Sequence, residues 1–410
     1  MDIDKISNTW YNRFREGVVS AFGVASQHPG LSVWLALICE THVCGQPTWS
    51  LFLYSVPSAV VPCLDFLLFG GTKMEFFGLA LFSSLTGGAL LAVAAVIFLV
   101  GLALTIKGGD WFVDSASWFA EATGIPKFVV GATVVSFATT LPELLVSVRA
   151  AMNGSAQLAI GNAVGSVTAN TTLIMGVSLV AMAGVISRRD FSLKGGLLIA
   201  AIVGLTVLSL SGVLPVWSAF ILWTIFIIFM ISNLIEGKKG AATDKVDTFE
   251  KKEIPSKIFF FILGTASIVF GAEFLVSSGK TIASGIGISE TIIGFTVIAL
   301  GTSLPELVTT LTAIRKKENS LSVGNIIGAN IIDTTLILPL CAVINGQPLP
   351  VDRVNLVFDF PVCIAACAVA IVPTIIQGRF KKWQGYTLLS IYALYMLFLV
   401  LNEVGVVALG

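Results

Sequence analysis

Two stretches of this sequence read almost alike: SFATTLPELLVSVRAAM at residues 136–152 and ALGTSLPELVTTLTAIR at residues 299–315. Both are apolar over most of their length, and each carries one glutamate directly after a proline, Glu143 in the first and Glu306 in the second. The offset between the two is 163 residues, and it holds without a gap over residues 101–172 of the first copy. The chain is therefore an internal duplication.

The composition places the chain in a lipid bilayer. Of its 410 residues, 56% are hydrophobic and only 12% are charged, which is more apolar than a soluble domain of this length can be. Basic and acidic side chains are equal in number, 24 of each, so nucleic-acid binding is not expected. The six cysteines show no metal-ligand spacing, and the N-terminus does not have the pattern of a cleaved signal peptide.

Apolar runs of roughly 17–25 residues, the length that crosses a bilayer, predict five transmembrane helices in each copy. An odd number of spans gives the two copies opposite orientations, as in inverted-repeat transporters, with the substrate bound between the repeats. The predicted fold is an all-α polytopic membrane protein whose ten core transmembrane helices form two inverted five-helix repeats. The helices are expected near 88–107, 127–152, 157–182, 195–212, 215–235, 257–279, 290–314, 321–344, 355–376 and 383–402.

The expected domain organisation has an N-terminal extension at 1–87, a first repeat half at 88–235, a cytoplasmic loop at 236–257 and a second repeat half at 258–410. The extension has apolar stretches broken by polar residues and proline, so we expect one extra span there, with re-entrant or surface helices as the alternative. The loop carries six lysines, which places it in the cytoplasm by the positive-inside rule. The expected location is the cell inner (plasma) membrane, with multiple passes.

The two glutamates are the candidate functional groups, because both are predicted near the bilayer midplane. A charge at the bilayer centre costs roughly 2.5–3.5 kcal/mol on insertion scales, so Glu143 and Glu306 need partners. The facing segments contain no lysine or arginine, which makes a bound cation the simplest partner. Pro142 and Pro305 each remove a backbone donor and open the helix, so carbonyl oxygens become available. Carboxylate, hydroxyl and carbonyl oxygens suit hard cations such as Ca²⁺ or Na⁺, whereas soft metals prefer His or Cys.

The helix that follows each glutamate segment contains a repeated GNxxG pattern, GNAVGS from Gly161 and GNIIGA from Gly324. Small residues at this spacing let membrane helices pack closely, and packing alone is the alternative interpretation of the motif. The same helices carry Asn170 and Asp333 at equivalent positions, which differ by one charge. The predicted site is therefore asymmetric, with up to three carboxylates.

A further acidic pair matches across the repeat. Asp110 and Glu273 lie where the first helix of each half meets polar residues. We expect these to be boundary or gating residues rather than ion ligands.

The paired segments ATTLPE and GTSLPE, each followed by a GNxxG helix, resemble the α-repeats of the calcium/cation antiporter superfamily, and most of all its prokaryotic sodium/calcium exchanger branch. The resemblance covers residues 88–402. It implies a ten-helix transporter that exchanges cytosolic Ca²⁺ for extracellular Na⁺ by alternating access, with the first helix of each half sliding over a core that holds the ions. The expected partners are Ca²⁺, Na⁺ and the lipid bilayer, with no cofactor, no nucleic acid and no obligate protein partner.

The resemblance also implies a set of oxygen ligands. Glu143 and Glu306 would bind Ca²⁺ and share the Na⁺ sites. Thr139 and Thr302, with the backbone carbonyls near Ser136 and Ala299, would complete the Ca²⁺ shell. The hydroxyls of Thr140, Ser303 and Ser166 would serve Na⁺, and Asn170 and Asp333 would line the central site.

Three residues depart from the family pattern and leave the counter-ion open. Ala138 stands where glycine is usual, Val167 stands where the second repeat has Asn330, and Ala329 stands where a serine hydroxyl is expected opposite Ser166. Losing that hydroxyl should weaken one Na⁺ site, so an antiporter that exchanges Ca²⁺ for H⁺ through the same carboxylates is the alternative. A passive cation channel is a third possibility, which the inverted repeat argues against. An enzyme is not expected, because no nucleophile with a matching base stands out.

Overall fold

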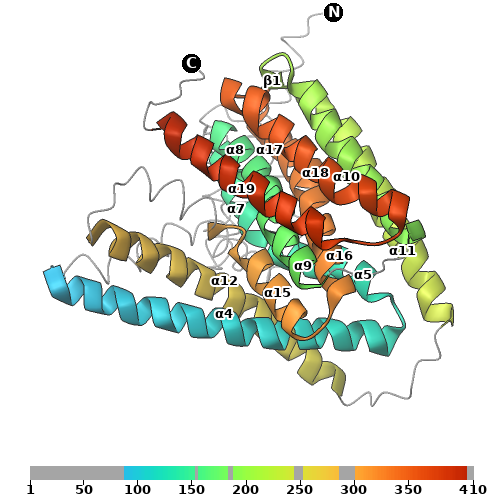
Figure 1. Ribbon diagram of the computed structural model, residues 1–410, viewed down its shortest axis with the longest axis horizontal. Helices are drawn as coiled ribbons and strands as arrows, with labels where there is room; N and C mark the ends of the chain where they lie inside the picture. Colours follow the sequence, from blue (N-terminus) through green and yellow to red (C-terminus); the bar gives the residue numbers. More distant parts are fainter. Residues whose placement is uncertain (1–86, 153–155, 183–187, 244–252, 286–300, 404–410) are drawn as a thin grey trace, which may run out of the picture. The chain divides into compact units, whose positions relative to one another are not determined.

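The computed structural model describes residues 87–152, 156–182, 188–243, 253–285 and 301–403, which are mostly helical (Figure 1). Eight helices in this part of the chain are long and apolar enough to cross a bilayer, and one bent pair, Lys127–Thr139 with Leu141–Met152, makes up to nine. The predicted all-α polytopic fold is confirmed. The count of ten spans stays a prediction, because the span expected at 290–314 is described only from residue 301. The N-terminal extension lies almost wholly outside the described residues.

The described part of the first half contains ten helical segments, where α marks an α-helix and η a π-helical turn. They are α4 (Gly87–Thr123), α5 (Lys127–Val130), η3 (Gly131–Val135), α6 (Ser136–Thr139), α7 (Leu141–Met152), α8 (Ala156–Ala169), η4 (Asn170–Ile174), α9 (Met175–Ala181), α10 (Arg188–Ser209) and α11 (Ser218–Thr243).

The described part of the second half repeats this order, with a gap before its second span. It comprises α12 (Ile254–Gly285), α15 (Leu304–Arg315), α16 (Asn319–Ile332), η7 (Asp333–Ile337), α17 (Leu338–Asn345), η8 (Asn355–Asp359), α18 (Phe360–Gln377) and α19 (Lys382–Glu403). Two short strands, β1 (Val213–Leu214) and β2 (Leu349–Pro350), pair antiparallel between the halves.

Two helices run well past their predicted ends. Helix α4 continues from the predicted limit at residue 107 to Thr123, and α11 continues from residue 235 to Thr243, inside the predicted cytoplasmic loop. Hydropathy marks where a helix leaves the apolar layer, not where its backbone hydrogen bonds stop. Beyond residue 107, Phe112 and Val113 of α4 are fully buried, so packing against protein continues the helix.

The first helices of the two halves, α4 and α12, pack side by side through glycine (Figure 1). A Cβ added at Gly101 would lie 2.9 Å from the Gly271 carbonyl oxygen, and one added at Gly108 would lie 2.9 Å from the Gly264 carbonyl oxygen. From the first contact to the second, the residue number rises along α4 and falls along α12, so the two helices are antiparallel. The repeat offset converts one pair into the other, because it takes Gly101 to Gly264 and Gly108 to Gly271. This arrangement agrees with the inverted repeat.

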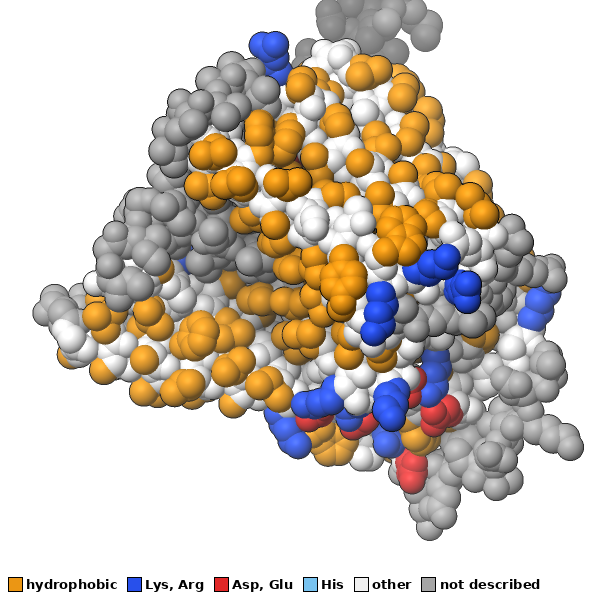
Figure 2. Space-filling view, viewed as in Figure 1, with side chains coloured by type: hydrophobic (Ala, Val, Ile, Leu, Met, Phe, Trp, Pro, Cys, Tyr) orange, Lys and Arg blue, Asp and Glu red, His pale blue; other side chains and the backbone are white. Residues whose placement is uncertain are grey.

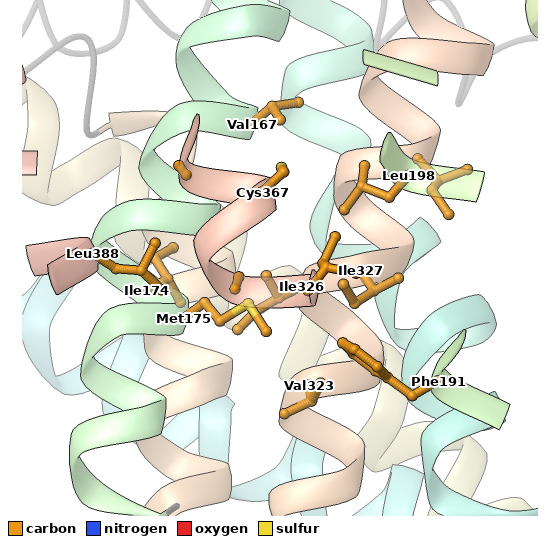
Figure 3. Close-up of a cluster of buried hydrophobic side chains, with 14 of the residues drawn as sticks. Val167, Ile174, Met175, Phe191, Leu198, Val323, Ile326, Ile327, Cys367 and Leu388 are labelled. Carbon is orange, nitrogen blue, oxygen red and sulfur yellow. The ribbon is translucent and has the colours of Figure 1, made fainter. Parts of the chain in front are cut away.

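Helix α16 is enclosed by other helices, and all its residues from Leu321 to Ile332 are buried. It contributes four side chains to an apolar cluster that also has residues of α8, η4, α9, α10, α18 and α19 (Figure 3). Lipid tails are as apolar as these side chains, so close packing rather than removal from water holds such a cluster together. The labelled members are Val167, Ile174, Met175, Phe191, Leu198, Val323, Ile326, Ile327, Cys367 and Leu388.

The outer surface matches a bilayer. Figure 2 shows apolar side chains over much of the visible face and most of the charged side chains in its lower right part. Only 17% of the most apolar stretch of α4 is buried in the protein, against 83% for the span Asn319–Asn345 that contains α16. Helix α4 therefore faces lipid along its apolar part, whereas α16 is enclosed by other helices.

Candidate ion-binding site

The predicted helix break is present in both copies. The first glutamate span bends by 47° between Thr139 and Leu141. The residue at the break, Thr140, has φ −85° and ψ 2°, and its repeat equivalent Ser303 has φ −84° and ψ 5°. The proline two residues later cannot donate a backbone hydrogen bond, so the helix restarts there in a new direction. Each restarted helix then carries its glutamate in its first turn.

Both glutamates are completely buried. Glu143 and Glu306 each have 0% of their surface exposed. The Thr140 hydroxyl donates a hydrogen bond to Glu306 Oε1 at 3.2 Å. Within the described part of the chain, Glu306 Oε2 and both carboxylate oxygens of Glu143 have no hydrogen-bond partner. Buried carboxylates in a membrane require a bound cation or a proton, so these oxygens are candidate ligands.

The two predicted threonine ligands make equivalent contacts across the repeats. The Thr139 hydroxyl donates to Asn325 Oδ1 at 3.2 Å, and the Thr302 hydroxyl donates to Asn162 Oδ1 at 3.3 Å. The repeat offset converts one contact into the other, so each half's broken helix is tied to the other half's GNxxG helix. A hydroxyl that donates its proton keeps lone pairs that can face a cation.

The asparagines of these contacts were absent from the predicted ligand set. Asn162 also donates to the Ser147 hydroxyl at 3.0 Å, so it links three elements. The sequence held a signal for this role, because each asparagine occurs at the same repeat position beside a predicted ligand helix. In the second copy the motif also packs closely, since a Cβ added at Gly324 would lie 2.3 Å from the Phe128 carbonyl oxygen. Packing and hydrogen bonding therefore coexist in this motif.

Backbone and serine ligands are only partly available. The Ser136 carbonyl already accepts the Thr140 N–H at 2.9 Å, and the Ser136 hydroxyl donates to the Gly131 carbonyl at 2.7 Å. The carbonyl that Pro142 leaves without a donor four residues back is that of Ala138. The Ser166 and Thr302 hydroxyl oxygens lie 3.5 Å apart. Ala299, the predicted equivalent of Ser136, lies outside the described residues.

Asn170 and Asp333 begin the π-helical turns η4 and η7, which occupy equivalent positions in the two halves. These turns were not predicted from the sequence, and π-helical turns occur often at functional sites. Both side chains are fully buried, and none of their polar atoms has a hydrogen-bond partner among the described residues. The carboxylates of Glu143, Glu306 and Asp333 lie within range of mutual electrostatic repulsion.

These three carboxylates do not form a compact acidic metal site. The described residues contain no group of three His, Cys, Asp or Glu side chains spaced to hold one ion. A cation there would need hydroxyl, amide and carbonyl oxygens beside the carboxylates, which is the mixed oxygen set that Ca²⁺ and Na⁺ accept. The predicted ligands that lie among the described residues are all buried except Thr302, which is half-buried.

Repeat-related broken helices, with buried carboxylates inside a multi-pass helical protein, define a secondary transporter of cations. Comparison with known proteins gives the particular family. The family described as "Sodium/calcium exchanger protein" matches residues 93–235 and 256–401. The chain belongs to this family, and the predicted resemblance is confirmed.

Relatives and solved structures agree with this assignment. The sodium/calcium exchanger MaX1 of Methanosarcina acetivorans is 30% identical over 367 residues, which cover 76% of this chain and 99% of the relative. The inner membrane protein YrbG of Escherichia coli is 34% identical over 278 residues, covering 64% of this chain and 84% of the relative. The solved structure of the sodium-calcium exchanger NCX_Mj superposes with a TM-score of 0.66 at 27% identity, over 75% of this chain and 98% of that one.

Proposed function

We propose that this protein is an antiporter that exchanges Ca²⁺ for Na⁺ by alternating access. The observation that carries the proposal is the set of buried carboxylate oxygens at the two helix breaks, of which only Glu306 Oε1 has a described hydrogen-bond donor. Such oxygens need a cation, and the surrounding donors are hydroxyls and amides rather than basic side chains. The relatives MaX1 and NCX_Mj are both named as sodium/calcium exchangers.

Shared ligands would couple the two fluxes. Ca²⁺ bound by Glu143 and Glu306 and Na⁺ bound by the same oxygens cannot occupy the site together. An empty site would carry uncompensated negative charge through the bilayer, which is costly. The protein therefore switches the site readily from one side of the membrane to the other only when the site is loaded with Ca²⁺ or with Na⁺. Thr139, Thr302, Thr140, Ser303 and Ser166, with Asn170 and Asp333 lining the centre, would complete the ligand shells.

A Ca²⁺/H⁺ antiporter is the second candidate, and two features of this chain favour it. Ala329 supplies no hydroxyl opposite Ser166, and Asp333 adds a third buried carboxylate. Protons bound to these carboxylates would neutralise the site in the return step without a Na⁺ shell. This mechanism keeps the Ca²⁺ site and changes only the coupling ion.

The family and the apolar helices make this a multi-pass membrane protein. We place it in the inner (plasma) membrane, where the name of its Escherichia coli relative YrbG also places that protein. No cofactor enters the proposed mechanism, because ion movement needs only oxygen ligands and a conformational change.

The test is uptake of radioactive calcium into proteoliposomes loaded with Na⁺ or, separately, carrying an imposed pH gradient. Glu306→Gln keeps the size of the side chain and removes its charge, so uptake should be abolished. Glu253→Gln, at an exposed position near the start of α12, is the matched control and should transport normally. Uptake that requires internal Na⁺ supports the Na⁺ mechanism, and uptake driven only by the pH gradient supports H⁺. Retained uptake in Glu306→Gln would remove this glutamate from the site.

A further inference from the structure

The turn from α18 into α19 carries three basic side chains within four positions, Arg379, Lys381 and Lys382. The Arg379 and Lys382 side chains are exposed, and Lys381 is half-buried. None of the three forms an ion pair in the part of the chain that the structure describes. The turn therefore presents concentrated positive charge without a described counter-charge. We call these three residues the basic turn.

Other basic side chains expected on the cytoplasmic side have carboxylate partners. Lys127, Lys194, Arg315 and Lys316 each pair with at least one Asp or Glu side chain. The basic turn also stands at the N-terminal end of α19, where the helix dipole is positive and favours anions over cations. Three cations at that end repel one another and the dipole. A local arrangement that opposes electrostatics is expected where a partner of opposite charge binds.

Two buried side chains hold the basic turn in a fixed position. The Gln384 amide donates to two backbone carbonyls of α18 and to the Thr374 hydroxyl, each at 3.0 Å. Gln384 Oε1 accepts the Lys381 backbone N–H at 2.8 Å. The Phe380 ring is buried and packs edge-on against Phe191 of α10, with 5.2 Å between ring centroids. An anion that binds the three cations would therefore have to order little of the backbone.

The basic turn lies at the end of the protein that is predicted to face the cytoplasm. Phe191, which contacts Phe380, lies three residues before Lys194 in α10. Lys194 pairs with Glu236, which belongs to the predicted cytoplasmic loop. The cytoplasmic leaflet is the one whose anionic lipids attract basic segments beside membrane helices.

Exposed apolar and aromatic side chains adjoin the basic turn on both helices, which pack against each other (Figure 1). Val372 and Ile376 are exposed on one face of α18, and Trp383 and Tyr386 are exposed on one face of α19. Trp and Tyr side chains gather at the level of the lipid headgroups. A soluble anion would meet only the cations, whereas a phospholipid would use the apolar surface as well.

We propose that Arg379, Lys381 and Lys382 bind the headgroup of an anionic phospholipid, whose acyl chains lie against the exposed apolar side chains of α18 and α19. The headgroup phosphate accepts hydrogen bonds from the guanidinium and ammonium groups. Because the lipid binds the folded protein, it stabilises the packed ends of the two helices. This lipid site is separate from the proposed ion site, and the inference does not rest on the proposed transport function.

The expected affinity follows from the number of charges. Each basic side chain near an anionic membrane surface contributes about fivefold in affinity. Loss of all three should therefore weaken binding by about 100-fold at low salt. Salt screens the exposed charges, so we expect a loss of about 10-fold at physiological ionic strength.

The experiment titrates phosphatidylglycerol into purified full-length protein in a neutral detergent. Native mass spectrometry measures the bound lipid, and thermal unfolding is followed at each lipid concentration. The test variant combines Arg379→Gln, Lys381→Gln and Lys382→Gln. The matched control removes three basic side chains from other segments expected in the cytoplasm, Lys238→Gln, Lys257→Gln and Lys317→Gln. A third variant, Lys381→Arg with Lys382→Arg, keeps the charge of the basic turn.

We expect the parent, the matched control and the charge-preserving variant to bind phosphatidylglycerol alike and to gain thermal stability from it. The test variant should bind about 10-fold more weakly. Phosphatidylcholine and inorganic phosphate should stabilise the parent much less than phosphatidylglycerol does. Equal losses in the test variant and the matched control would overturn the site, because the effect would then be one of total charge.

Two further outcomes would also overturn it. If inorganic phosphate or phosphatidylcholine stabilised the parent as well as phosphatidylglycerol does, the turn would not recognise an anionic lipid. If the test variant unfolds more easily even without lipid, the parent decides the matter through its salt dependence. Binding to the parent must weaken as salt rises, and binding that stays constant would contradict a site built from exposed cations.

Discussion

At the scale of single residues, the two halves of the site are unequal. The Thr140 hydroxyl donates to Glu306, whereas the hydroxyl of its equivalent Ser303 and the carboxylate of Glu143 have no partners in the described part of the chain. The asymmetry extends to Asp333, which replaces the neutral Asn170. Nearly identical motifs thus give two glutamates with different surroundings.

This asymmetry predicts that Thr140→Val harms calcium binding more than Ser303→Ala. Valine keeps the shape of threonine but leaves Glu306 without its described donor. A hydrogen bond to a charged group contributes about 1.5–3 kcal/mol, so the half-saturating Ca²⁺ concentration should rise by about 10-fold or more. Ser303→Ala removes a hydroxyl that donates to no described acceptor and should change it less than about threefold. Calcium-dependent uptake measures both, and equal effects would contradict the asymmetry.

At the scale of elements, the contact between α4 and α12 is made by backbone atoms. A Cβ added at Gly264 would lie 2.7 Å from the Phe112 nitrogen and 2.8 Å from the Gly108 carbonyl oxygen. Neither atom can rotate away as a side chain would. The same helix contains Gly279, where the nearest described atom would be 4.0 Å from the added carbon.

The two glycines of α12 therefore predict opposite outcomes. Gly264→Ala should force the helices apart and cost about 1–3 kcal/mol, as overpacking in a close-packed interface does. Gly279→Ala should be neutral or slightly stabilising, because alanine is the better helix former by about 1 kcal/mol. Thermal unfolding of the purified protein compares them directly. A Gly264→Ala variant as stable as the parent would mean that the helices can separate at no cost.

At the scale of the whole molecule, the contacts between connecting segments agree with the predicted alternation of spans. Alternating the predicted spans outward from the cytoplasmic loop 236–257 places Lys194 in the cytoplasm as well, and Lys194 pairs with Glu236 of that loop. The Gln157 amide donates to Asp352 at 3.0 Å, and both lie in segments expected outside. Strands β1 and β2, which pair with each other, also belong to segments expected outside. Each contact joins two segments placed on the same side.

This topology predicts opposite labelling of two single-cysteine variants. Arg353→Cys should react with a membrane-impermeant maleimide added to intact cells, whereas Lys238→Cys should react only after the membrane is opened. Both positions are exposed, so accessibility in the protein does not limit the reaction. The background is the chain with its native cysteines replaced, which must still take up calcium. The reverse labelling pattern would invert the whole topology.

The sequence by itself determined the membrane class, the duplication, the approximate spans and the two glutamates at the breaks. Hydropathy, proline and identity at a fixed offset are local properties that need no knowledge of packing. Thr139 and Thr302, which only the family resemblance named as ligands, contact the GNxxG helices in the structure, and their role as ion ligands stays a prediction. The predicted ends of α4 and α11 were wrong, because hydropathy does not mark where the backbone hydrogen bonds of a helix stop.

Only the tertiary structure decided which groups meet. Thr139 hydrogen-bonds to Asn325, 186 positions away in the chain, and Thr140 hydrogen-bonds to Glu306, 166 positions away. Residue spacing in the sequence does not predict contacts over such separations. The turns at Asn170 and Asp333 became π-helical without any distinctive composition, since a π turn depends on the packing around it. The ion pairs between α4 and the end of α15, such as that of Asp114 with Lys316, likewise needed the fold, because these charges lie far apart in the chain and meet only when the helices pack.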